Sequence, residues 1–164
     1  MSVEFKDFSM QVKAALNDTT KAWLNTWANE IAAQAKDNTQ MDGDVGVELR
    51  KSYKADVNDG AGEAKIGTPL EAGFWEEYGT GAYAAHGDGR KGWWVYIEGQ
   101  ESGKGGKAYA TKEEAEEAAA FLRSEKKLKA CVTNGRKPAY TLEKAFTAVK
   151  PKAEADLEKR LKGL

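Results

Sequence analysis

Residues 50–67, RKSYKADVNDGAGEAKIG, carry the pattern of a β-hairpin. Apolar and polar side chains alternate along Arg50–Val57, which is the period of a half-buried strand. Residues 58–60, Asn-Asp-Gly, predict a turn, and Glu63–Gly67 predicts the returning strand. Antiparallel β-structure is therefore expected in this part of the chain.

Helices are predicted on both sides of this hairpin. Between Ser9 and Lys36 large apolar residues recur at offsets of four and seven, which places them on one face of a long N-terminal helix. Asn38 and the glycines beyond it are expected to end this helix. Another helix is predicted after Pro138, and Lys150-Pro151 is expected to break or bend it because proline has no backbone N–H.

The intervening segment contains a strong strand signal and a strong helix start. Residues 93–97, Trp-Trp-Val-Tyr-Ile, predict a strand, with 107–110 as its expected partner across a glycine-rich turn at 99–106. Residues 111–114, Thr-Lys-Glu-Glu, match a capping box and predict a helix over 111–130. Residues 70–78 fit either a short helix or an extended piece. Together these patterns predict an α+β fold with a long N-terminal helix, a small mainly antiparallel β-sheet and C-terminal helices, in a single domain spanning 1–164.

Composition excludes several classes of protein. The net charge is −1, so no whole-chain electrostatic case for nucleic acid exists, although basic residues gather between Arg123 and Lys137. That cluster fits either a solvated helix face or a surface for an acidic partner. The single cysteine, Cys131, cannot form an intramolecular disulfide or a thiolate zinc cluster. We expect no signal peptide and no membrane span, because no apolar run approaches about 20 residues. Only 26 residues are Leu, Ile, Val or Phe, which predicts a small core completed by aromatic residues between neighbouring copies.

The chain supplies few residues for catalysis. His86 is the only histidine and lies in a glycine-rich loop, where it cannot be held with the accuracy that catalysis needs. Glu76 and Glu77 are adjacent, so they are expected to point apart. Residues 87–92, Gly-Asp-Gly-Arg-Lys-Gly, lack the spacing of a phosphate-binding loop. We therefore expect no catalytic, cofactor-binding or metal-binding residues and no cofactor.

Three short motifs nevertheless occur in a familiar order: Glu-Tyr-Gly-Thr-Gly at 77–81, Gly-Arg-x-x-Trp-Trp-Val-Tyr at 89–96, and Lys-Pro-x-Tyr at 137–140. In this order they resemble the tail-component family of long-tailed bacteriophages, a group that includes lambda-type minor tail protein Z and related tail-completion and neck proteins. Residues 43–52 resemble an earlier motif of that family but lack its threonine, and Tyr140 stands where phenylalanine is usual. Residues 111–130 have no counterpart and resemble a helical insertion. The resemblance makes these residues the family-motif and interface candidates: Glu77, Tyr78, Gly79, Thr80, Gly81, Gly89, Arg90, Trp93, Trp94, Tyr96, Lys137, Pro138 and Tyr140.

The resemblance implies a non-enzymatic structural protein of the virion, assembled in the host bacterial cytoplasm. It implies a ring subunit at the head–tail junction or tail top that acts in tail completion or head–tail joining. The expected partners are other copies of the chain, neighbouring neck and tail proteins, and DNA in the channel nearby, with no membrane. A tail terminator or a head-closure protein of the same neck is the alternative within this class.

Two hypotheses from other classes stay open at the level of sequence. One is a small hydrolase that uses His86 and Glu77. The other is a binding module in which Trp93, Trp94 and Tyr96 form a stacking platform for sugar or nucleic acid. Surface display of the tryptophans favours that platform, whereas burial of both excludes it.

Overall fold

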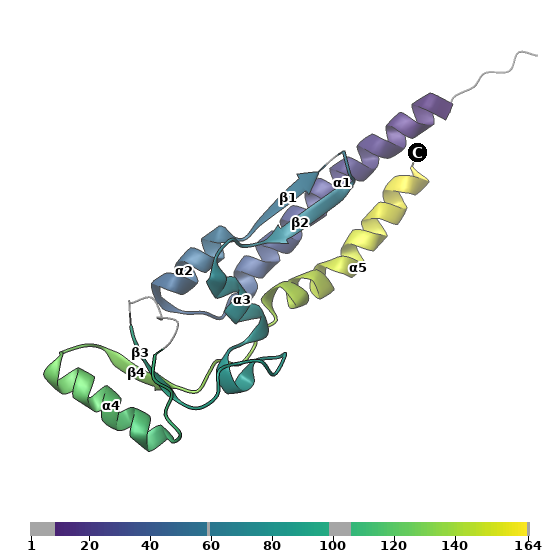
Figure 1. Cartoon of the computed structure of the whole chain (residues 1–164). Helices are drawn as coiled ribbons and strands as arrows, with labels where there is room; N and C mark the ends of the chain where they lie inside the picture. Colours follow the sequence, from purple (N-terminus) through teal and green to yellow (C-terminus); the bar gives the residue numbers. More distant parts are fainter. Residues whose placement is uncertain (1–8, 59, 99–105, 164) are drawn as a thin grey trace, which may run out of the picture. The chain divides into compact units, whose positions relative to one another are not determined.

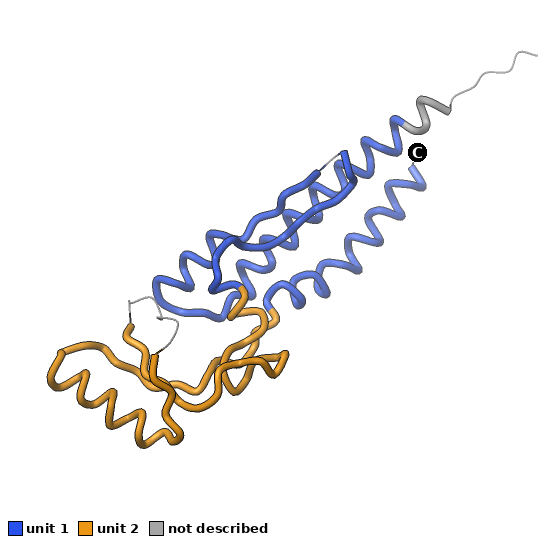
Figure 2. Tube along the Cα trace, in the orientation of Figure 1, with its two compact units in different colours: residues 1–73, 141–164 blue, residues 74–140 orange. Residues whose placement is uncertain are grey.

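The computed structural model describes residues 9–58, 60–98 and 106–163, and of the side chains at 9–13 nothing is described. The chain divides into two compact units, one formed by residues 1–73 and 141–164 and the other by residues 74–140 (Figure 2). The predicted α+β class is confirmed, with the strands divided between two two-stranded antiparallel sheets. The elements are α1 (Ser9–Asn38), α2 (Gly43–Ser52), β1 (Lys54–Asn58), β2 (Glu63–Gly67), α3 (Glu71–Tyr78), a short 3-10 turn (Gly81–Tyr83), β3 (Trp94–Ile97), α4 (Lys112–Glu125), β4 (Ala130–Thr133) and α5 (Thr141–Lys162).

In the first unit, α1 is the common packing partner. The β1–β2 hairpin and α5 both lie along it (Figure 1). Two tryptophans of α1 hold α5 through their indole N–H groups: Trp23 donates to the backbone oxygen of Ala153 at 2.7 Å, and Trp27 donates to the carboxylate of Asp156 at 2.8 Å. The core is built from small and medium side chains, chiefly Ala28, Ile31, Ala32, Ala35, Leu49, Tyr53, Ala145, Val149 and Ala153.

The predicted hairpin is confirmed. Ala55 faces Ile66 and Asp56 faces Lys65 across an antiparallel pair. The turn is stabilised by the side chain of Asn58, whose oxygen accepts hydrogen bonds from the backbone N–H groups of Gly60 and Ala61. Such side-chain bonds are the reason that asparagine favours turns.

The first strand starts later than predicted, because residues 50–52 close helix α2. Leu49 is fully buried, and Arg50 donates to the backbone oxygens of Thr39 and Met41 at 3.2 Å each. These contacts favour helix over strand up to Ser52, and β1 begins after the buried Tyr53.

Helix α5 continues through Pro151 as one element, so, of the predicted break or bend, the break does not occur. The ambiguous segment 70–78 is helical, as α3. Among the described residues no helix combines the length and the apolar character that a bilayer requires.

In the second unit, β3 pairs with β4 and not with residues 107–110. Trp94 faces Thr133 and Ile97 faces Ala130, so the helix predicted to end at Ala130 ends at Glu125 and the chain returns as a strand. The expected partner segment makes a single bridge, in which the backbones of Trp93 and Tyr109 exchange hydrogen bonds of 2.9 and 2.7 Å. The predicted turn at 99–106 falls almost entirely outside the described residues.

The capping box that begins α4 is confirmed. The Thr111 hydroxyl accepts from the backbone N–H of Glu114 at 3.2 Å, and the Glu114 carboxylate accepts from the N–H of Ala110 at 3.0 Å. The carboxylate therefore reaches one residue further back than the usual capping partner.

Candidate functional site

The first and third sequence motifs lie side by side in the second unit. We call residues 76–82 and 134–140 the clamp. Its two segments are joined by backbone hydrogen bonds: Thr80 donates to Arg136, Ala82 donates to Asn134, and Ala139 donates to Glu76, each at 2.8 Å. The Thr80 hydroxyl also accepts from the N–H of Arg136 at 3.0 Å. The motif order in the sequence thus reflects one continuous contact in space.

A buried ion pair joins the same two segments. The Glu76 carboxylate is fully buried and lies 2.8 Å from a guanidinium nitrogen of Arg136, whose side chain is about one-third exposed. A buried carboxylate is tolerated only when it is paired and hydrogen-bonded. The sequence analysis did not select Glu76 or Arg136 as site residues, although each directly adjoins a selected motif.

Two glycines allow the clamp to close. Gly79 and Gly81 have φ angles of +71° and +59°, which side-chain-bearing residues rarely adopt. A Cβ atom on Gly79 would lie 2.6 Å from the Arg136 oxygen, and one on Gly81 would lie 2.6 Å from the Trp94 ring and overlap the Asn134 oxygen. The two glycines of the motif are therefore required by conformation and by space.

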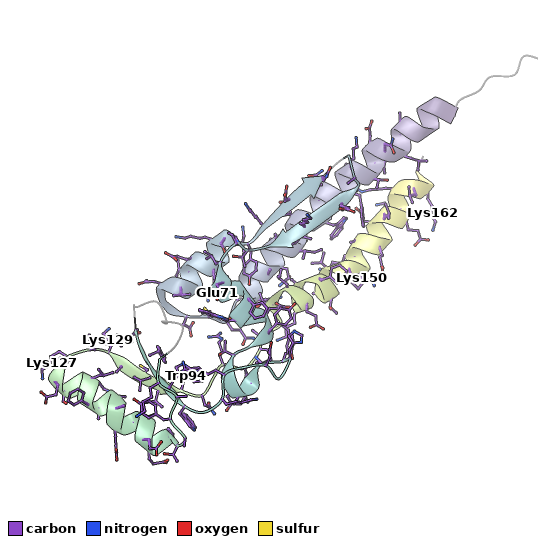
Figure 3. All side chains as sticks on the ribbon, viewed as in Figure 1. Glu71, Trp94, Lys127, Lys129, Lys150 and Lys162 are labelled. Atoms are coloured by element: carbon purple, nitrogen blue, oxygen red, sulfur yellow. The ribbon has the colours of Figure 1, made fainter. Side chains whose placement is uncertain are left out.

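The second motif packs against the clamp through one face of its strand. Gly89 approaches the Gly81 oxygen so closely that no side chain fits, and the Arg90 guanidinium lies over the Trp94 ring at 5.0 Å. Arg90 also donates to the backbone oxygen of Gly106. Trp94, labelled on Figure 3, thus lies between Arg90 and Gly81.

The three residues of the predicted stacking platform do not share one face. Side chains alternate along a strand, so Trp93 points away from Trp94 and Tyr96. Both tryptophans are half-buried, and Lys112 lies over the Trp93 ring at 5.9 Å. Each indole therefore already has a cation of its own chain on one face, which disfavours a stacking platform.

Tyr96 is 38% exposed and lies beside Cys131 on the facing strand. Burial, with a smaller effect of the neighbouring thiol, raises the pKa of its phenol. Tyr96 is therefore neutral at neutral pH.

The remaining motif residues belong to the clamp itself. Lys137 lies over the Tyr83 ring at 5.9 Å, the Pro138 nitrogen lies close to Gly79, and Tyr140 adopts a φ of +53° at the end of the unit. Tyr78 is 37% exposed, and its ring contacts Phe74 on one side and His86 on the other, with ring centroids 5.0 Å apart in each case.

The two residues of the hydrolase hypothesis differ in their exposure. His86 is exposed against the ring of Tyr78, and Glu77 is buried in the clamp. Within the described parts of the chain, no three His, Cys, Asp or Glu side chains are grouped so that they could hold a metal ion. The clamp itself consists of backbone hydrogen bonds, a buried ion pair and close glycine contacts.

Comparison with known families agrees with these motifs. Residues 4–98 match the family described as bacteriophage HK97-gp10, putative tail-component. The match covers more than half of the chain and includes the first and second motifs and one side of the clamp. No curated protein and no solved structure matches the chain at a significant level. The chain therefore belongs to the HK97-gp10-like family of bacteriophage tail components.

Proposed function

We propose that this tail component is a non-enzymatic ring subunit at the head–tail junction or tail top, where it acts in tail completion or head–tail joining. One observation carries the proposal: the family motifs build a structural clamp, and aromatic rings beside that clamp are left exposed. Phe74, Tyr78 and Tyr83 are 57%, 37% and 41% exposed. Aromatic residues at a surface are typical anchors of protein–protein contacts.

Other copies of the chain and neighbouring neck and tail proteins are the proposed partners. Exposed apolar side chains occur on the first unit as well, at Val45, Val47 and Phe146. A ring subunit needs two different contact surfaces, one for each neighbour, because a head-to-tail contact joins two different patches of the same chain. Exposed apolar residues on both units are consistent with this requirement.

DNA in the channel is a further proposed neighbour. Lys126, Lys127 and Lys129 are exposed at the end of α4 and the start of β4, and two of them are labelled in Figure 3. Lys129 lies 3.6 Å from Glu98 in a highly exposed pair, which has little energetic weight. The basic side chains therefore remain available to an acidic surface, while the chain as a whole carries almost no net charge.

We also propose that residues 1–164 form one domain and that residues 111–130 are an insertion in it. The family match ends at residue 98, before this segment. Within this segment α4 ends at Glu125, and Ala130 pairs with Ile97.

The test is deletion of the gene in the phage and electron microscopy of the lysate. DNA-filled heads and separate tails that fail to join, with normal capsids, are the expected result. Infectious, fully joined particles without the protein would refute the proposal, and empty or absent heads would move the role to capsid assembly or packaging. Addition of purified protein to separated heads or separated tails distinguishes tail completion from head closure or tail termination.

A further inference from the structure

The first unit contains an apolar groove that no described part of the chain fills. It lies between α1, β2 and α5 and has a volume of about 270 Å³. A cavity of about 150 Å³ already accepts a benzene molecule, so this groove has room for at least one aromatic side chain. Its lining residues are mainly apolar: from α1 Trp23, Leu24, Trp27, Ala28 and Ile31; from β2 Ala64 and Ile66; and from α5 Phe146, Lys150, Ala153 and Glu154.

We propose that this groove binds the N-terminal segment, residues 3–8, of a neighbouring copy of the chain. The inference rests on the proposed ring and gives it a contact. The segment, Val-Glu-Phe-Lys-Asp-Phe, contains three large apolar residues among six. The family match begins at residue 4 and includes most of this segment.

Charge supports the same occupant. The rim of the groove carries Lys150 and Glu154, which form a loose pair at 3.8 Å on the exposed side of α5 (Lys150 is labelled in Figure 3). The segment carries Glu4, Lys6 and Asp7 between its apolar residues. Charges of both signs in the segment can therefore meet charges of both signs at the rim of the groove.

The N-terminal segment cannot reach the groove of its own chain. Trp27, at the middle of the α1 part of the lining, is 18 residues beyond Ser9, which corresponds to about 27 Å along a helix. Phe5 is four residues before Ser9, and four extended residues span at most about 14 Å. Phe5 and Phe8 therefore cannot reach the centre of their own groove by any path, so only a second copy can supply them.

The test is disulfide trapping in assembled particles. A phage that lacks the gene is complemented with the full chain carrying Phe5→Cys and Ala64→Cys, with Cys131→Ser to remove the native thiol. Ala64 lines the groove on β2, whereas Ala61 lies exposed in the hairpin turn and serves as the matched control. After mild oxidation of purified particles, the groove variant should give a ladder of dimers and higher multimers. The Phe5→Cys/Ala61→Cys control should remain monomeric.

A variant whose side chain fills the groove tests the inference independently. Ala64→Trp should block the groove and reduce incorporation of the protein into particles at least tenfold, whereas the control Ala61→Trp should be incorporated normally. Circular dichroism of both purified variants shows whether they fold.

Three outcomes would overturn the inference. These are joined particles that contain the protein without crosslinks, crosslinks within one chain only, and a ladder from Phe5→Cys alone. In each case the proposed role in joining would survive, because that role depends on whether the particles join. Joined particles that lack the protein altogether would instead refute the role.

Discussion

Replacement of Gly81 by alanine tests whether the clamp holds the second unit together. Alanine at a φ of +59° carries a strain of about 1–2 kcal/mol. Its Cβ would also overlap the Asn134 oxygen and lie 2.6 Å from the Trp94 ring, so the two segments must separate. Separation weakens the backbone hydrogen bonds Ala82–Asn134 and Thr80–Arg136, at about 1 kcal/mol each. The expected loss of stability is therefore about 3–4 kcal/mol.

Gly87→Ala is the matched control for this change. Gly87 lies in the same unit with a φ of +72°, yet nothing lies within 4 Å of the position its Cβ would take. Only the strain applies there, so we expect a loss of about 1–2 kcal/mol. The difference between the two variants isolates the contact across the clamp.

Urea denaturation followed by tryptophan fluorescence measures both variants, because Trp94 adjoins Gly81. In thermal melts, each kcal/mol corresponds to about 2–4 °C for a chain of this size. Equal losses for the two variants would show that the overlap relaxes without cost. A Gly81→Ala protein as stable as the wild type would show that the clamp does not hold the unit together.

Three further changes test other parts of the structure. Thr111→Ala removes the N-cap of α4 and should cost about 1 kcal/mol in thermal unfolding; an unchanged midpoint would mean that the helix start melts separately. The pKa of Asp156 is lowered chiefly by the hydrogen bond from Trp27. This hydrogen bond therefore stabilises the folded chain fully above the ordinary carboxyl pKa, and the stabilisation is lost as the pH falls through the lowered pKa of Asp156. Asp156→Asn should be less stable than the wild type at neutral pH and should lack the acid-dependent shift of the Trp27 indole proton in NMR spectra; a shift that persists would exclude Asp156 as its cause. His86→Ala should support infection at the wild-type level in a complementation assay, since His86 only packs on an exposed ring, and complete loss of infectivity with a folded protein would contradict this.

The elements that could be predicted from sequence are those fixed by neighbouring residues. The N-terminal helix was predicted to Lys36 and ends at Asn38, and the hairpin and the capping box are fixed by contacts within a few residues. Helix α2 was missed because its glycines suggested an end, while the contacts that stabilise it come from the Thr39–Met41 segment and from the buried Leu49.

Long-range contacts account for the other errors. Strand β4 has only four residues, and its pairing with β3 spans more than thirty positions of sequence, so no local signal identifies it. The Glu76–Arg136 pair was missed for the same reason, since charged residues are most often solvated and only the fold shows that Glu76 is buried. The glycines and the tryptophans were selected from the order of the motifs, and their part in the function stays a prediction.

The clamp also has an evolutionary consequence. It holds residues 82 and 134 together, so everything between them forms a loop whose two ends are fixed at one place. Insertions between β3 and β4 can therefore lengthen this loop without altering the path of the chain on either side. In polymer terms, the entropy needed to close it rises only slowly with length, by about 0.6 kcal/mol for each doubling. A change of length between β3 and β4 is in this way a change that the chain can undergo while the two segments of the clamp stay in place.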